Sequence, residues 1–177
     1  MASQNFKDTK SFKDACNQIE HIVIDTDGVL TDGTFQYSRF GKTLKTFGSH
    51  DGRALQIAKK FFDIQMISAD LRGFKITKSR ARDLNIPCTY VSEKDRKSWI
   101  ESTFQKNNTA LIADSFSDIP SIDAAAISFA PNNAHPAFSE RATTKLSLAS
   151  GSGAVSEALD ILLFNKHALH LWECLDG

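Results

Sequence analysis

The sequence predicts an α/β fold with a mostly parallel, Rossmann-like sheet, flanking helices and a β-hairpin flap. Short apolar runs alternate with longer helix-like segments, which is the order expected of βαβ units. The length of 177 residues favours a single domain with a core of its own. No repeat or low-complexity linker interrupts the alternation, so we expect one domain over residues 1–177.

The expected strands are short and apolar on both faces, as in the buried strands of parallel sheets. They lie at residues 21–24, 64–68, 88–91, 110–113, 126–129 and, more weakly, 145–148. The expected helices carry apolar side chains three or four residues apart. They lie at residues 53–62, 75–84, 97–106 and from 153 to about 173. Residues 1–18 are expected to form a leading helix or arm, and residues 166–177 a tail.

Residues 34–47 interrupt this order with a predicted β-hairpin. Phe35 and Tyr37 alternate with polar neighbours, and Gly41 supplies the turn. The hairpin follows the first strand closely, so it should project over the carboxyl end of the sheet, where open α/β sheets bind ligands. An isolated hairpin cannot bury so many large apolar groups within itself, so we expect it to pack against another subunit.

The composition excludes several classes of partner. Lysine plus arginine and aspartate plus glutamate number 21 each, so no overall positive field attracts nucleic acid or an anionic membrane. The three cysteines are far apart, which argues against a zinc site or a disulfide framework. No apolar run approaches the roughly 18–20 residues that cross a bilayer, and the N-terminus lacks a signal-peptide pattern. We therefore expect a cytoplasmic location.

The strongest chemical signal is Asp25-Thr26-Asp27-Gly28, directly after the first strand. Two carboxylates at positions i and i+2 can converge on one point, and their repulsion favours a hard cation such as Mg²⁺. One carboxylate can attack phosphorus while the other protonates the leaving oxygen. The same short pattern occurs in calcium loops, but the rest of an EF-hand is absent.

The segment DTDGVLTDG at residues 25–33 resembles the first motif of the haloacid dehalogenase superfamily. More narrowly, it resembles the capless phosphatases typified by 3-deoxy-D-manno-octulosonate 8-phosphate phosphatase. FGSHDG at 47–52, AHP at 134–136 and GSGAV at 151–155 match in the same order. The resemblance implies a Rossmann-like sheet, Mg²⁺, a small phosphorylated substrate and usually a homotetramer. In that family the hairpin and a neighbouring subunit's tail help to enclose the site.

The resemblance also implies a role for each motif residue. Asp25 would be the nucleophile that forms an aspartyl-phosphate, and Asp27 the general acid/base whose backbone carbonyl also binds the metal. Asp25, Asp27 and Asp114 would together hold Mg²⁺. Ser68, at the second-motif position, would hydrogen-bond the phosphoryl oxygens. Asp118 would support the fourth-motif loop.

The third motif requires a phosphate-binding cation, and residues 93–97 (EKDRK) offer three. Aligning Ile100 and Phe104 with the family's helix places Arg96 where lysine is usual. Lys94 and Lys97 remain open as alternatives. An arginine would bind phosphate through two hydrogen bonds rather than as a point charge.

Several positions depart from the family pattern, and three of them replace arginines that surround an anionic sugar acid. The substituted positions are His50, Ala69, Asp70, Ala113, Ser115 and Ser152. The loss removes cations that could pair with a substrate carboxylate, and Asp70 would repel one. Arg72 could partly compensate, and Asp51 of the Asp-Gly pair is a further candidate substrate contact.

Two functions are therefore compared. The first is a Mg²⁺-dependent phosphatase acting through an aspartyl-phosphate on a small phosphorylated metabolite, a sugar or sugar-acid phosphate. The second is a catalytically degenerate family member that serves as a binding, structural or regulatory subunit in a sugar-nucleotide (sialic-acid-like) pathway. Survival of the acidic trio favours the phosphatase, because such a cluster has no obvious structural use.

Overall fold

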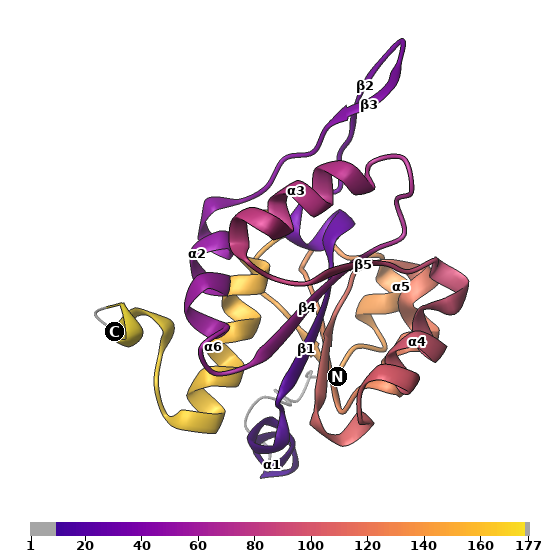
Figure 1. Ribbon diagram of the computed structural model, residues 1–177. Helices are drawn as coiled ribbons and strands as arrows, with labels where there is room; N and C mark the ends of the chain where they lie inside the picture. Colours follow the sequence, from indigo (N-terminus) through magenta and orange to yellow (C-terminus); the bar gives the residue numbers. More distant parts are fainter. Residues whose placement is uncertain (1–9, 176–177) are drawn as a thin grey trace.

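The computed structural model describes residues 10–175, which form an α/β body around a six-stranded parallel sheet (Figure 1). The strands lie in the order β5-β4-β1-β6-β7-β8. Their bounds are β1 (His21–Asp25), β4 (Asp63–Ser68), β5 (Cys88–Tyr90), β6 (Thr109–Ile112), β7 (Ile127–Ala130) and β8 (Thr144–Lys145). The predicted fold class is confirmed, and each predicted strand is present with ends that differ by a few residues.

Helices cover both faces of the sheet. The α-helices are α1 (Lys10–Gln18), α2 (Ser49–Ala58), α3 (Phe74–Leu84), α4 (Arg96–Thr103), α5 (Pro136–Ser139) and α6 (Ala154–His167). The 3₁₀ segments are η3 (Glu93–Asp95), η4 (Lys106–Asn108), η5 (Phe116–Ala124) and η6 (Leu171–Cys174). One core cluster joins the sheet to α1, α2, α3 and α6, and a second joins the other face to α4, α5 and η5.

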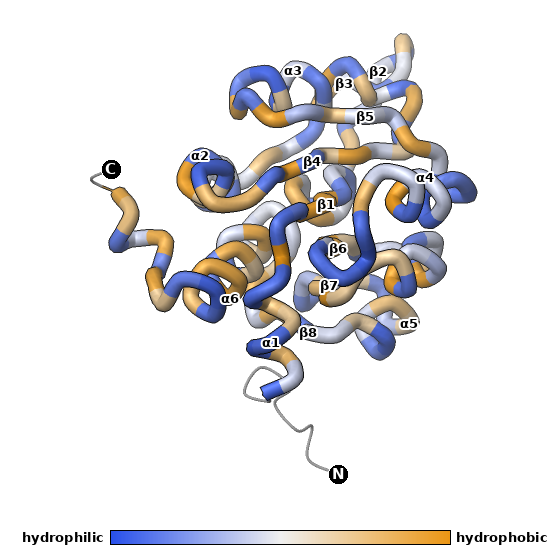
Figure 2. Tube along the Cα trace, turned by 60° about the horizontal axis from the view of Figure 1, so that its bottom comes forward, coloured by the Kyte–Doolittle hydropathy of each residue, from blue (hydrophilic) through white to orange (hydrophobic). Residues whose placement is uncertain are grey.

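The central strands owe their position to their side chains. In β1, every residue after His21 is buried, with apolar groups directed into both core clusters. Figure 2 shows β4, β1, β6 and β7 side by side between the helix layers, with apolar segments along them. Strands that are buried on both faces need this continuous apolar sequence, which is why the short runs predicted the sheet.

The hairpin forms as predicted, from β2 (Gln36–Ser38) and β3 (Gly41–Leu44). It projects from the carboxyl edge of the sheet (Figure 1), and a bridge between Thr31 and Phe47 closes its base. Its strands pair with a register shift between Gln36 and Tyr37. A register shift of this kind is typical of a β-bulge, which increases the local twist of a two-stranded ribbon.

Two elements, α2 and η5, differ from the sequence prediction, and the predicted N-terminal and C-terminal segments lie partly outside the described residues. Helix α2 begins at Ser49, earlier than expected. The 3₁₀ segment η5 was not predicted; its internal Pro120 has no N–H to donate, which disfavours a regular α-helix there. The leading helix is α1, and residues 1–9 and 176–177 fall outside the described residues. No helix within residues 10–175 is long and apolar enough to cross a membrane.

Candidate active site

The acidic loop leaves β1 at Asp25 and forms a single wide turn, η2 (Thr26–Leu30). Thr26 Oγ1 donates a hydrogen bond to the Ile67 carbonyl (2.9 Å), which ties the loop to β4. Thr31 Oγ1 accepts hydrogen bonds from the Gly28 and Gly33 N–H groups at 3.1 and 3.3 Å. These contacts hold the turn directly above the carboxyl end of the sheet.

Gly28 is required in this turn for two reasons. Its φ of +88° lies in the left-handed region that favours glycine. A Cβ at this position would also stand 2.3 Å from Asp114 Oδ2, which is far inside contact distance. The absence of a side chain at Gly28 therefore permits the close approach of Asp114 to the loop.

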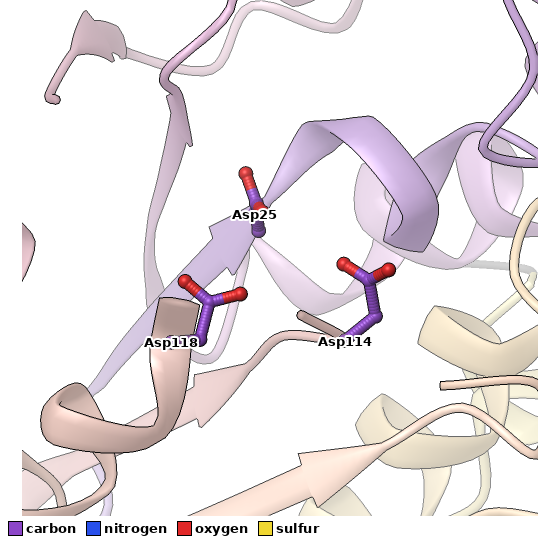
Figure 3. Close-up of side chains that lie close together, drawn as sticks. All are labelled: Asp25, Asp114 and Asp118. Carbon is purple, nitrogen blue, oxygen red and sulfur yellow. The ribbon is translucent and has the colours of Figure 1, made fainter. Parts of the chain in front are cut away.

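Parallel pairing brings the acidic residues to one edge. Ile24 of β1 lies opposite Ile112 of β6, so the loops that follow these two strands emerge side by side. Asp25, Asp114 and Asp118 gather there, with carboxylate oxygens within 4.8 Å of one another (Figure 3). The predicted meeting of Asp25 with Asp114 is thus found.

Arg96 is the buried cation of this cluster, with an exposed fraction of 2%. Its Nη1 lies 3.0 Å from Asp25 Oδ2, and its Nη2 lies 3.4 Å from Asp25 Oδ1. Nη1 also donates to Asp118 Oδ1. The guanidinium therefore spans Asp25 and Asp118, and its position beside Asp25 suits contact with a phosphoryl group.

The two other candidate cations lie elsewhere. Lys94 is exposed, and Lys97 pairs with Glu101 and Asp123 on the surface of α4 and η5. Of the three candidate cations of the third motif, Arg96 is the one that contacts Asp25.

Asp118 and Ser115 support the loop. The Ser115 N–H donates to Asp118 Oδ2 (3.1 Å), and Ser115 Oγ accepts from the Ser117 N–H (3.3 Å). Together they form a capping box at the start of η5. The family pattern has a second acidic residue at position 115. Here the Ser115 hydroxyl accepts the hydrogen bond from the Ser117 backbone N–H, so serine can fill this position in the loop. Both oxygens of Asp118 accept hydrogen bonds, one from the Ser115 N–H and the other from Arg96.

Asp114, unlike Asp118, has a carboxylate oxygen without a hydrogen-bond donor among the described residues. Among residues 10–175, none donates a hydrogen bond to its buried Oδ1. Burial and then the nearby Asp118 carboxylate raise the pKa of Asp114 to about 7. Burial likewise raises the pKa of Asp25, while Arg96 opposes this rise. Crowded carboxylates with an unpartnered oxygen suit a hard divalent cation, so Asp25, Asp114 and the Asp27 carbonyl fit as ligands.

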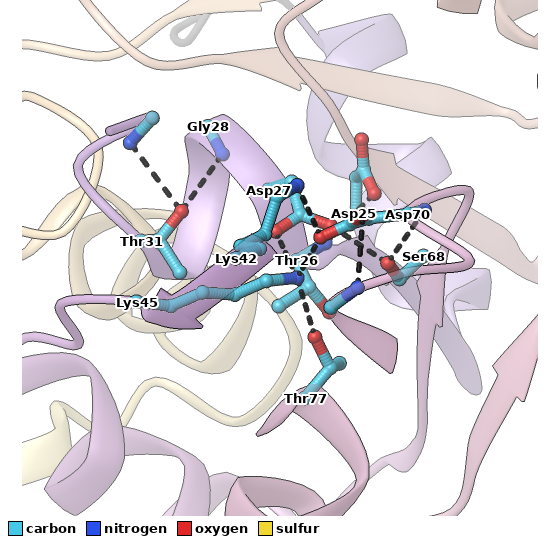
Figure 4. A network of polar contacts seen from close by, with 12 residues as sticks. Asp25, Thr26, Asp27, Gly28, Thr31, Lys42, Lys45, Ser68, Asp70 and Thr77 are labelled. Atoms are coloured by element: carbon cyan, nitrogen blue, oxygen red, sulfur yellow. Dashed lines mark hydrogen bonds and ion pairs between the residues drawn. The ribbon is translucent and has the colours of Figure 1, made fainter. Parts of the chain in front are cut away.

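Ser68 ends β4 and is fully buried. Its Oγ donates to Asp27 Oδ2 (2.7 Å) and accepts from the Asp70 N–H (3.1 Å) (Figure 4). In this structure Ser68 therefore contacts the second carboxylate of the motif. The sequence predicted that this hydroxyl would hydrogen-bond the phosphoryl oxygens of a substrate, and that role stays a prediction.

Sequence reasoning missed Lys45, whose side chain has an exposed fraction of 0%. Its Nζ lies 2.5 Å from Asp27 Oδ1 and 2.9 Å from Asp70 Oδ2. It also donates to Thr77 Oγ1 at 2.9 Å. Figure 4 shows this ammonium reaching from the base of the hairpin to the acidic loop. The only available signal was that the returning hairpin strand passes over that loop.

Lys42 was also missed. Its Nζ lies 2.6 Å from Asp70 Oδ2 and 3.4 Å from the centre of the Phe35 ring. Burial alone would raise the pKa of Asp70, but Lys42 and Lys45 lower it to about 2. Asp70 is therefore ionised and paired, whereas the sequence suggested an unpaired, repelling charge.

The two candidate substrate contacts lie apart from this cluster. Asp51 is 1% exposed, and it accepts hydrogen bonds from the Gly153 (3.2 Å) and Ser156 (2.9 Å) N–H groups at the start of α6. Arg72 is exposed in the turn before α3. Neither Asp51 nor Arg72 is among the described residues that line the cavity beside the acidic loop. Asp51 instead stabilises the N-terminus of a core helix.

A cavity of about 350 Å³ opens beside the acidic loop. Asp25, Asp27 and Asp114 are among the residues that line it. The hairpin contributes Phe35 and Lys42 to its wall. Its size is that of a small-molecule site, and charged side chains of both signs line it.

The fold and this site define a hydrolase of the haloacid dehalogenase superfamily. No protein-family model matches the sequence. The 3-deoxy-D-manno-octulosonate 8-phosphate phosphatase of Escherichia coli K12 is 30% identical over 156 residues, covering 85% of this chain and 82% of that protein. The Haemophilus influenzae phosphatase of the same name is 30% identical over 151 residues, covering 82% and 83%. The chain belongs to the 3-deoxy-D-manno-octulosonate 8-phosphate phosphatase family.

Solved structures agree with this assignment. A subfamily III A hydrolase of the superfamily from Legionella pneumophila superposes with a TM-score of 0.80 at 26% identity, covering 88% of each chain. The cobalt-bound octulosonate phosphatase from Haemophilus influenzae gives a TM-score of 0.78 at 26% identity, covering 86% of this chain and 91% of that one. The prediction of a phosphatase of this superfamily is confirmed.

Proposed function

We propose that the protein is a Mg²⁺-dependent phosphomonoester hydrolase that acts through an aspartyl-phosphate on a small phosphorylated sugar. The observation that carries this proposal is the convergence of Asp25 and Asp114 beside Arg96, with Asp114 Oδ1 left without a hydrogen-bond donor among the described residues. No contact of the described residues favours the alternative of a degenerate regulatory subunit.

The metal ligands would be Asp25, Asp114 and the Asp27 carbonyl. Carboxylate and carbonyl oxygens are the donors that Mg²⁺ prefers. When bound, the ion supplies positive charge against the phosphoryl oxygens and the attacking carboxylate. The solved Haemophilus influenzae structure is a cobalt-bound form, which supports a divalent cation as the cofactor.

The chain's own residues account for the chemistry. The Asp25 carboxylate attacks phosphorus, the bond from phosphorus to the ester oxygen breaks, and Asp27 gives its proton to that leaving oxygen. Asp27 then takes a proton from the water that attacks the phosphorylated Asp25. This second displacement releases inorganic phosphate and restores the Asp25 carboxylate.

Three neighbours position these groups. Arg96 contacts both oxygens of Asp25, at 3.0 and 3.4 Å, and stands where it can also bind the phosphoryl oxygens. Ser68 and Lys45 hold the two oxygens of Asp27, at 2.7 and 2.5 Å. A general acid held from both sides keeps the orientation that proton transfer requires.

Two substitutions test the mechanism. Asp25→Asn should abolish release of phosphate, because an amide cannot attack phosphorus. Asp27→Asn should slow turnover by roughly a hundredfold or more. Asp63→Asn is the matched control, since Asp63 is an exposed carboxylate at the opposite end of β4. Phosphate release is measured with and without Mg²⁺ over a broad substrate panel.

The outcomes are distinct. Wild-type protein that releases no phosphate from any substrate would favour the degenerate alternative. Activity retained in Asp25→Asn would place the nucleophile elsewhere.

We also propose a homotetramer, with a cytoplasmic location. The hairpin exposes Tyr37, Phe40 and Leu44, whose exposed fractions are 62%, 84% and 55%. Contiguous apolar groups of this kind mark an interaction surface. Light scattering of wild type and of Phe40→Ser should show a tetramer and a smaller species, respectively. A monomeric wild type at micromolar concentration would refute the assembly.

A further inference from the structure

The end of the cavity nearest the hairpin is where the substrate's leaving group would lie under the proposed function. Asp25 marks the position of the phosphoryl group, and the lining also includes Phe35 and Lys42 of the hairpin and Asp70, which pairs with Lys42. A second anionic group on the substrate would need an unpaired cation there, because desolvating an unpaired charge is costly. The charge state of this end therefore bears on the kind of substrate.

The lysines at this end are already paired. Lys42 and Lys45 both approach Asp70 Oδ2, at 2.6 and 2.9 Å, and Lys45 also lies 2.5 Å from Asp27 Oδ1. Two ammonium groups thus balance two carboxylates. The side chains of Lys42, Lys45 and Asp70 have exposed fractions of 7%, 0% and 12%, so the cluster is largely withdrawn from water.

Freeing either lysine has a cost. Moving Lys42 toward a ligand would take its ammonium away from both Asp70 and the face of the Phe35 ring. A mostly buried carboxylate would lose one of its two ion pairs. The cluster therefore resists offering a cation to the substrate.

The remaining charges do not change this balance. Arg96 is the other cation on the cavity lining among residues 10–175, and it contacts Asp25 and Asp118 at the phosphoryl end. Glu93, which is on the same cavity lining, adds an exposed negative charge. A substrate carboxylate placed there would meet like charge with no unpaired cation beside it.

We infer that the leaving group of the substrate is uncharged, a phosphorylated neutral sugar or polyol rather than a phosphorylated sugar acid. The lining suits such a group. Asp70 and Glu93 can accept hydrogen bonds from sugar hydroxyls, Ser117 can donate or accept, and Phe35 can pack against a sugar face. This substrate class differs from the octulosonate in the names of the relatives.

Matched substrates test the inference. Glucose 6-phosphate and 6-phosphogluconate form one pair, and ribose 5-phosphate and 5-phosphoribonate form another. Each pair compares an aldose phosphate with the corresponding aldonate. We expect kcat/KM to favour the neutral member of each pair by about tenfold or more, the scale of an unpaired like charge at a binding site. Equal rates, or a preference for the aldonates, would overturn the inference.

Failure of the inference and failure of the proposed function are distinguishable. p-Nitrophenyl phosphate reports phosphatase activity without a sugar. Release from p-nitrophenyl phosphate together with a preference for aldonates rejects only the neutral leaving group. Absence of release from every compound, including p-nitrophenyl phosphate, rejects both.

Asp70→Asn tests the cause. It removes the carboxylate that holds Lys42, so the kcat/KM ratio should shift toward the aldonates by about tenfold. Asp63→Asn removes the same charge at a distant, exposed position and should leave the ratio unchanged. Adding Lys42→Gln to Asp70→Asn should cancel the shift, because Lys42 would be the freed cation. An unchanged ratio in a folded Asp70→Asn protein would overturn the assignment to this cluster.

Discussion

Replacing Lys45 with methionine removes a buried ammonium while keeping the length of the side chain. Lys45 lies 2.5 Å from Asp27 Oδ1 and 2.9 Å from Asp70 Oδ2. At an effective dielectric constant of about 20, each attraction is on the order of 6 kcal/mol before desolvation is subtracted. Removing one partner of such a buried pair typically costs about 3–5 kcal/mol, because the remaining carboxylates stay uncompensated. We expect a loss in that range.

The assay is urea unfolding followed by circular dichroism. With a slope of about 2 kcal/mol per molar urea, the midpoint should fall by about 2 M. Lys97→Met is the matched control, since Lys97 has a side-chain exposed fraction of 39% and its nearest carboxylate oxygen lies 3.6 Å away. Its free energy of unfolding should change by about 0.5 kcal/mol or less.

A second variant separates the charge effect from packing. Lys45→Met combined with Asp70→Asn should recover part of the loss, because one stranded carboxylate is then neutral. The reasoning is refuted if Lys45→Met unfolds at the same urea concentration as Lys97→Met. It is equally refuted if the double variant is as unstable as the sum of the two single variants.

Three further predictions concern the metal site, the N-terminus of α6, and the loss of stability at low pH. Gly28→Ala should abolish the rise in melting temperature on adding Mg²⁺, because its Cβ would displace Asp114; thermal melts with and without the ion test this. Asp51→Ala should lower the free energy of unfolding by about 2 kcal/mol in urea titrations, and Asp51→Asn by less, because an amide oxygen still accepts a hydrogen bond. The pKa of Asp70 is lowered, so its stabilisation is present above about pH 4 and is lost toward pH 2. Urea titrations at several pH values should show that the wild-type protein has a larger free energy of unfolding than Asp70→Asn above about pH 4, and that this difference disappears toward pH 2.

Local sequence patterns predicted the fold because the central strands are apolar on both faces. The same pattern predicted the acidic site, since Asp25, Ser68 and Asp114 each end or closely follow a short apolar run and parallel strands end at one edge. The positions of Asp25, Ser68 and Asp114 follow directly from where the strands end along the sequence.

The cations were harder to predict because their positions depend on tertiary structure. Alignment of Ile100 and Phe104 with the family's helix favoured Arg96, but Lys94 and Lys97 stayed open because the side chain that faces the sheet edge is decided by tertiary structure. Lys42 and Lys45 reach the site through a hairpin whose twist and register shift leave no simple sequence signal. From the sequence, Asp70 was expected to repel a substrate carboxylate. Its two ion-pair partners, Lys42 and Lys45, belong to the hairpin, so the sequence did not reveal that the charge of Asp70 is balanced.

The hairpin joins two parts of the molecule that have different neighbours. Its base is fixed by the bridge between Thr31 and Phe47, and Lys45 there holds Asp27. Its outer part exposes Phe40 to whatever lies beside it. In the proposed homotetramer, a neighbouring subunit that binds the outer part of the hairpin would also constrain the position of the Lys45 ammonium beside Asp27, the proposed general acid. Dilution that separates subunits would then slow proton transfer, although the residues released touch no reacting atom.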